Sequence, residues 1–176
     1  PQATTLVGAH PAAAVLSGVE YAPHVRLYAA RRARTQQQRP RSGIHALPND
    51  VVATVELSSG RGGAWGRVPD DWEWLLICAP AATSGMLLDL DEAEAARRLW
   101  DAAAEIDPRI FTLDDADVVH LVRWHAAVPV VSPGYFERLR RLRQRPPIVF
   151  CGDWLVQPCV EGAVRSGLQA ARALTG

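Results

Sequence analysis

Runs of apolar residues along the chain predict several β-strands. These runs are rich in β-branched or aromatic residues and are bounded by Gly, Pro, Asp or Ser, as strands usually are. The strongest reads Trp-Glu-Trp-Leu-Leu-Ile-Cys at residues 72–78, between two Pro-containing segments. The predicted strands are residues 4–7, 25–29, 51–57, 72–78 and 118–124, with a short buried strand at 148–151.

A helical period is clearest at residues 91–106. Leu99, Trp100 and Ala103 lie on one stripe of such a helix and predict its buried face. Asp91 is a candidate N-cap, and Glu94 three residues later is its capping-box partner. Further helices are predicted at residues 12–16, 135–145 and 161–174.

Two polar stretches between these elements are predicted to be loops. Residues 31–42 are basic and polar, which favours an exposed loop, and residues 58–63 favour a turn with 64–68 returning as its hairpin partner. The glycines of residues 60–66 superficially resemble a dinucleotide-binding loop. That loop must open a helix, and residues 67–72 do not read as one, so a hairpin turn is favoured.

The order of elements predicts a mixed α/β (α+β) fold, because strands come first and then alternate with helices without a regular βαβ repeat. The chain has 176 residues, 48% hydrophobic and 22% charged, which suffices for a packed core and excludes wholesale disorder. No apolar run is long enough to span a membrane, and no signal-like start is present. A cytoplasmic protein is therefore expected.

The net charge of the whole chain is zero, but the charges are unevenly distributed along it. Net charge is +6 over residues 21–67, −10 over 68–117 and +5 over 118–176, and zero overall argues against a nucleic-acid partner. The acidic stretch is either the solvated face of a helix or a protein-binding surface. All 19 basic residues are Arg, so no lysine is present for Schiff-base or general-base chemistry. The three cysteines show no metal-ligand spacing, and no metal is predicted.

The most informative segment lies near the end of the chain. An apolar run at 148–151 is followed by Gly152 and Asp153, and a short loop then leads into a helix that starts around Glu161-Gly162-Ala163. A carboxylate at a strand end can accept hydrogen bonds from ligand hydroxyls, and open N–H groups at a helix start attract an anion or carbonyl oxygen. The alternative is a plain strand–loop–helix in which Asp153 caps a turn.

This segment resembles the C-terminal flavin-contact motif of the FAD-dependent amine oxidase and protoporphyrinogen oxidase superfamily. The resemblance is specific over residues 148–174, extends through Arg123-Trp124, Pro129 and Gly134-Tyr135, and is looser over residues 4–16 and 19–22. It implies three parts: residues 1–20 as the end of an FAD-binding domain, 21–122 as a substrate-binding domain with a sheet and helices, and 123–176 as the strand–helix return to the FAD-binding domain.

The resemblance also implies site residues. Asp153 is expected to hydrogen-bond the ribityl or pyrophosphate part of FAD, with Gly152 allowing close approach. The N–H groups around Val160, Glu161, Gly162 and Ala163 are expected to face the flavin. Trp124 is expected to line the substrate cavity, or else to be an ordinary core residue.

Two departures from the family pattern matter. The family's N-terminal glycine-rich Rossmann unit is missing, and the chain starts at Pro1, so we expect a fragment, a cleavage product or one subunit of a split enzyme that needs an N-terminal FAD-binding half. The family's lysine near the flavin is also missing. His24 is a weak candidate for its acid–base role, or else a surface residue, and the lack of lysine favours the protoporphyrinogen oxidase or desaturase side.

Two functions follow as hypotheses. The first is the C-terminal part of an FAD-dependent oxidoreductase that transfers a hydride from a C–H or C–N bond of a small organic substrate to flavin N5. The alternative is a non-catalytic accessory or degenerate module that binds a protein through its acidic helix and basic flanks. In either case, apolar surface around 148–151 and 164–174 is expected to be uncovered and to favour a homo-oligomer or a partner.

Overall fold

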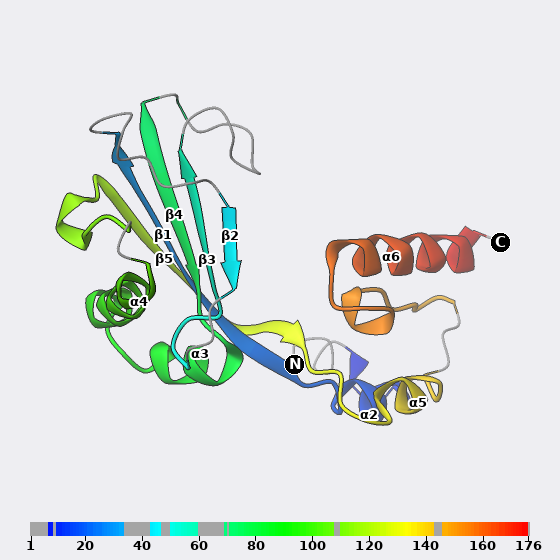
Figure 1. The fold of residues 1–176 in the computed structure, drawn as a ribbon. Coiled ribbons are helices and arrows are strands. Elements are labelled where there is room, and N and C mark those ends of the chain that lie inside the picture. The colour runs from blue at the N-terminus through cyan, green and yellow to red at the C-terminus, as the bar shows by residue number, and fades with distance from the viewer. Residues whose placement is uncertain are drawn as a thin grey trace. The chain divides into compact units, whose positions relative to one another are not determined.

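The computed structural model describes residues 7–8, 10–33, 43–46, 50–59, 69, 71–107, 110–142 and 146–175. The chain divides into two compact units (Figure 1). One unit is Pro23–His125, and the other combines Pro1–Ala22 with Ala126–Gly176.

The unit Pro23–His125 is built on a five-stranded sheet with the order β2-β3-β4-β1-β5. Strand β1 pairs antiparallel with β4, β4 with β3, and β3 with β2. Strands β1 and β5 continue beyond the limits of this unit. The strands are β1 Tyr21–Arg32, β2 Gly43–Ala46, β3 Thr54–Ser59, β4 Trp72–Cys78 and β5 Val118–Pro129.

Side chains alternate between the two faces of this sheet, and one face is covered by helices. Helices α3 (Ala81–Leu88) and α4 (Glu92–Ile106) contribute Leu87, Leu99 and Trp100 to the core. The sheet meets them with alternate residues that are almost fully buried, because successive residues of a strand point to opposite faces. These sheet residues are Val25, Leu27, Ala29, Val55, Leu57, Leu75 and Ile77.

Helix α4 begins as the sequence predicts. The Asp91 carboxylate accepts a hydrogen bond of 2.8 Å from the Glu94 N–H, which confirms Asp91 as the N-cap. The Glu94 carboxylate does not return to the cap. It accepts a hydrogen bond of 2.8 Å from Nε of Arg98 one turn later, so only half of the predicted capping box forms.

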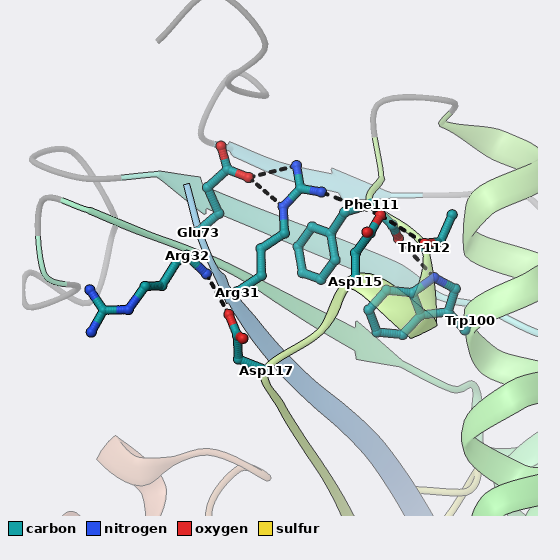
Figure 2. Close-up of polar contacts among 8 residues, drawn as sticks. All are labelled: Arg31, Arg32, Glu73, Trp100, Phe111, Thr112, Asp115 and Asp117. Carbon is teal, nitrogen blue, oxygen red and sulfur yellow. Dashed lines mark hydrogen bonds and ion pairs between the residues drawn. The ribbon is translucent and has the colours of Figure 1, made fainter. Parts of the chain in front are cut away.

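A buried ion pair fastens residues 110–117 to the sheet (Figure 2). Arg31 Nε and Nη2 each lie 2.8 Å from Glu73 Oε2, and the Glu73 side chain is 1% exposed. The same guanidinium lies 4.5 Å from the ring centre of Phe111 and 3.7 Å from the Asp115 carboxylate. The polar contacts of Arg31 therefore join two strands to the segment that leads into β5.

The other unit is mostly helical and has a small core. Its elements are α2 (Ala13–Leu16), α5 (Tyr135–Leu139), the 3-10 helix η4 (Asp153–Leu155) and α6 (Val160–Thr175). Ala12, Leu16 and Leu142 form a buried apolar cluster in it, and Phe150, Trp154 and Leu155 are among the residues that pack against this cluster. The 16-residue α6 buries only Gly162 and Ser166.

The mixed α/β fold class is confirmed, with specific differences. The structure adds β2 and α3, which the sequence pattern did not reveal, and α5 ends at Leu139 although the predicted helix runs to 145. The buried strand predicted at 148–151 is wrong for this chain: Ile148 makes only an isolated β-bridge and is 42% exposed, and Cys151 is exposed, because these residues join none of the strands of the described sheet. The predictions for residues 4–6, 34–42 and 60–68 lie outside the described residues.

Candidate functional site

Gly152 occupies a backbone conformation that suits glycine. Its φ is +144°, and a Cβ at this position would lie 2.4 Å from the Trp154 ring. Its N–H donates a hydrogen bond of 2.8 Å to Ser166 Oγ, and that hydroxyl donates to the Ala163 carbonyl. The start of η4 is thus tied to the buried face of α6, which fixes the position of Asp153.

The Asp153 carboxylate accepts no hydrogen bond from any side chain or N–H that the structure describes. Its charge nonetheless raises the pKa of two tyrosines. Burial raises the pKa of Tyr21, and Asp153 raises it further. The pKa of Tyr135 rises to about 12, mainly through burial, then through Tyr21 and Asp153, with Arg138 opposing. Tyr135 donates its hydroxyl to the Trp154 carbonyl at 2.9 Å. Asp153 is therefore a half-exposed acceptor whose carboxylate has no hydrogen-bond donor among the described residues.

The first turn of α6 is capped by a residue that sequence reasoning did not single out. Cys159 Sγ accepts hydrogen bonds from the Gly162 N–H at 3.4 Å and from Gln157 Nε2 at 2.9 Å. The Cys159 carbonyl accepts from the Ala163 N–H at 3.1 Å. The Gly162 N–H and the Gln157 amide lower the pKa of the Cys159 thiol, chiefly because they stabilise the thiolate.

The N–H groups at the start of α6, around Glu161, Gly162 and Ala163, were expected to face the flavin, but contacts within the chain already involve some of them. The N–H groups of Gly162 and Ala163 already have partners within the chain. A Cβ on Gly162 would lie 2.0 Å from the Gln157 carbonyl oxygen, so the close approach that glycine permits is made here by the chain itself. The Val160 side chain is 82% exposed, and Glu161 pairs with Arg165 at 3.8 Å.

In the unit Pro23–His125 the structure brings His24 and Trp124 together. Their rings stack with centroids 6.0 Å apart and an interplanar angle of 19°. Arg26, two residues along the same face of β1, donates Nε–H to His24 Nε2 at 2.8 Å, and its guanidinium carbon lies 5.6 Å from the Trp124 ring centre. Sequence reasoning missed Arg26, although the alternation of a strand places residues 24 and 26 on one face.

His24 is engaged on both sides of its ring. Burial lowers its pKa first and the neighbouring Arg26 charge lowers it further, while a hydrogen bond to the Ala79 carbonyl opposes this. A ring that donates to Ala79 and accepts from Arg26 is a neutral imidazole. His24 is thus placed to hold Arg26 through its Nε2.

The predicted site residues therefore form two groups. Gly152, Asp153 and the residues at the start of α6 lie in one compact unit, and His24 and Trp124 lie in the other. Within residues 7–8, 10–33, 43–46, 50–59, 69, 71–107, 110–142 and 146–175, no group of three or more candidate ligands gathers to hold a metal ion. No helix in that part of the chain is long and apolar enough to cross a bilayer.

Comparisons with known proteins bear on this arrangement. No curated protein matches the chain at a significant level. Among solved structures, a putative protoporphyrinogen oxidase from Exiguobacterium sp. 255-15 matches all of this chain with a TM-score of 0.74 and 14% identity. Cyclohexylamine oxidase from Brevibacterium oxydans IH-35A matches 92% with a TM-score of 0.61 and 15% identity. A double mutant of putrescine oxidase, redesigned in its cofactor binding, matches 88% with a TM-score of 0.61 and 16% identity.

These matches show the fold and also a difference in length, because the chain spans only 40%, 37% and 36% of those three structures, respectively. The sequence model described as "Flavin containing amine oxidoreductase" matches residues 65–175, which is more than half of the chain. The match includes β4, α4, β5 and the segment from Gly152 to Ala163. The chain belongs to the flavin-containing amine oxidoreductase family.

Proposed function

We propose that this chain supplies part of an FAD-dependent oxidoreductase. In this proposal residues 21–122 form the substrate-binding domain, and residues 1–20 and 123–176 belong to the FAD-binding domain. The family match and the fold of the solved oxidases support this reading. The boundaries between the two compact units follow Ala22 and His125, close to the proposed domain boundaries.

The observation that carries the proposal is the free Asp153 carboxylate beside Gly152. The sugar-alcohol chain of a flavin nucleotide presents hydroxyl donors, and a carboxylate with no hydrogen-bonding partner in the described chain is a matching acceptor. The residues therefore fit the polar part of the cofactor. When bound, the flavin supplies the acceptor for a hydride from a C–H or C–N bond of the substrate.

The residues of this chain have separate tasks in the proposal. Asp153 accepts hydrogen bonds from the cofactor, and Gly152, whose positive φ and close Trp154 ring exclude a side chain, forms the turn that places Asp153. Val160, Glu161, Gly162 and Ala163 stay close to the flavin as the positive end of α6, whose dipole favours negative charge near it even though Cys159 caps two of the N–H groups. Trp124 lines the substrate side, and His24 positions Arg26 there.

An N-terminal FAD-binding half is the proposed partner, from the same precursor or from a separate subunit. Helix α6 carries an exposed apolar stripe: Val164 and Leu168 are each 56% exposed and Leu174 is 53% exposed. Ile148 is also exposed, at 42%. Apolar side chains in such number on one helix favour burial against another protein surface. The free cysteines fit a cytoplasmic setting.

The alternative function is a non-catalytic accessory module that binds a protein. The outer face of α4 favours it, because Glu92, Asp101 and Glu105 are exposed there while Leu99 and Trp100 face the core. In that case the acidic helix is the binding surface, and Asp153 has no ligand. Binding of flavin separates the two functions.

The test is to tag the chain in its native host, purify it with whatever binds it, and record the visible absorption spectrum. We expect the bands of bound flavin with the wild-type chain and with Asp101→Asn as the matched control. Asp153→Asn is expected to lose flavin, since the amide removes the charge that holds the hydroxyl donors. A flavin spectrum that survives Asp153→Asn unchanged contradicts the proposed placement.

A further inference from the structure

The sheet of the unit Pro23–His125 has a cavity on the face that α3 and α4 leave uncovered. Its volume is about 350 Å³, and Arg26, Tyr28, Trp74 and Leu76 line it. Tyr28 is paired with Leu76 in the β1–β4 register. Arg26 lies two residues before Tyr28 on β1, and Trp74 lies two residues before Leu76 on β4, so all four side chains share one face. Ligand pockets span roughly 300–1,000 Å³, and this cavity lies at the lower end of that range.

Arg26 differs from its neighbours on β1 in lacking an acid. Arg31 pairs with Glu73 and Asp115, and Arg32 pairs with Asp71. Arg26 has no carboxylate within ion-pair distance among the described residues. Its only polar partner there is His24, through Nε, so both terminal nitrogens of the guanidinium remain available.

The guanidinium is also held in place. His24 accepts from its Nε, and Trp124, which stacks on His24, lies beneath it at 5.6 Å. Because the imidazole is held neutral by burial and by Arg26 itself, it adds no second charge to the cavity. A fixed guanidinium with two free nitrogens is a planar fork that matches the two oxygens of a carboxylate.

The other walls of the cavity favour a flat apolar group. Tyr28, Trp74 and Leu76 offer two aromatic rings and an aliphatic side chain. Glu56 lies opposite Leu76 on the same face, but it is 6% exposed and already has an interaction of its own. A cationic amine in this cavity therefore meets the unpaired charge of Arg26 without a free acid to offset it.

We propose that this cavity binds the carboxylate end of a flat, apolar substrate through Arg26, with His24 as a positioning residue. The inference deepens the proposed function, since it names the substrate class of the proposed substrate-binding part. It concerns only residues of the unit Pro23–His125 and requires no flavin.

The test is calorimetric titration of the full chain with three probes of one shape: cinnamate, cinnamamide and cinnamylamine. We expect cinnamate to bind at least about tenfold more tightly than the amide, because hydrogen bonds between a guanidinium and a carboxylate are stronger than those to a neutral amide. Cinnamylamine is expected to bind least. Arg26→Gln should remove the preference, and Arg26→Lys should keep only part of it, because a point charge lacks the fork.

Arg32→Gln is the matched control, because Arg32 lies on the same strand with its charge already paired to Asp71 outside the cavity. It should leave the preference for cinnamate unchanged. The proposal is overturned if wild-type chain does not bind cinnamate, if the amine binds as well as the carboxylate, or if Arg26→Gln keeps the preference. These outcomes leave flavin binding through Asp153 unaffected, so the two proposals fail separately.

Discussion

Gly162 and Gly167 lie on the same helix, and alanine at the two positions is expected to have opposite effects. At Gly162 a Cβ would lie 2.0 Å from the Gln157 carbonyl oxygen and 3.0 Å from both the Gln157 carbonyl carbon and Cγ. At Gly167 a Cβ meets nothing within 4 Å. The loop backbone must therefore move for one substitution and need not move for the other.

The magnitudes follow from two terms. Alanine gains up to about 1 kcal/mol over glycine inside a helix, and at Gly167 this is the only term. At Gly162 the overlap is with backbone, and forced overpacking costs about 1–3 kcal/mol, which outweighs that gain. We expect Gly167→Ala to stabilise α6 by about 0.5–1 kcal/mol and Gly162→Ala to destabilise it by about 1–2 kcal/mol.

Hydrogen exchange of the α6 amides, resolved by mass spectrometry, is the appropriate assay, because it reports local opening of one helix in a chain with two compact units. Exchange should slow in Gly167→Ala and speed up in Gly162→Ala. Equal protection in the two variants, or slower exchange in Gly162→Ala, would mean that the Gln157 carbonyl does not occupy the space over Gly162.

Three further predictions concern other contacts. Glu73→Gln leaves Arg31 without its buried acid and should lower the free energy of unfolding in urea by about 3–5 kcal/mol. Glu94→Gln on the surface should lower it by less than about 1 kcal/mol. Equal losses in the two variants count against a stabilising role of the buried pair. The pKa of Tyr135, about 12, lies above the unfolded value, so its contribution to stability is present below pH 10 and lost as pH rises toward 12. Asp153→Asn should lower that pKa in a phenolate absorbance titration, and an unchanged curve would place Asp153 elsewhere. Cys159 should react with iodoacetamide faster than an unperturbed thiol at neutral pH, and a rate that does not rise argues against its lowered pKa.

Local patterns predicted those elements that rest on strong local signals. Strand β4 has the predicted limits, since its apolar run is bounded by turn residues on both sides. Helix α4 starts after Asp91 as predicted, because a side-chain cap is encoded within four residues. Helix α3 gave no such signal. Its sequence, Ala-Ala-Thr-Ser-Gly-Met-Leu-Leu, has no apolar period, and it is held by tertiary contacts such as the Ser84 hydroxyl, which accepts the Val25 N–H at 3.1 Å.

The candidate site was only partly predictable, because some of its contacts depend on tertiary geometry that the local sequence does not encode. Gly152 and Asp153 follow an apolar run, and that order alone marks a turn with an acceptor. The role of Cys159 depends on where its sulfur lies relative to the Gly162 N–H, which no spacing rule gives. The importance of Arg26 depends on its having no acid within ion-pair distance among the described residues, whereas Arg31 and Arg32 on the same strand are paired.

Whether this chain holds a flavin through Asp153 is decided by the flavin content of the chain purified from its native host with the proteins that bind it. Membership of the flavin-containing amine oxidoreductase family and the free Asp153 carboxylate predict bound flavin in an amount equal to the chain, lost in Asp153→Asn and retained in Asp101→Asn. If the chain purifies with its partners but without flavin, or if Asp153→Asn leaves the flavin content unchanged, then Asp153 does not hold a flavin in this protein.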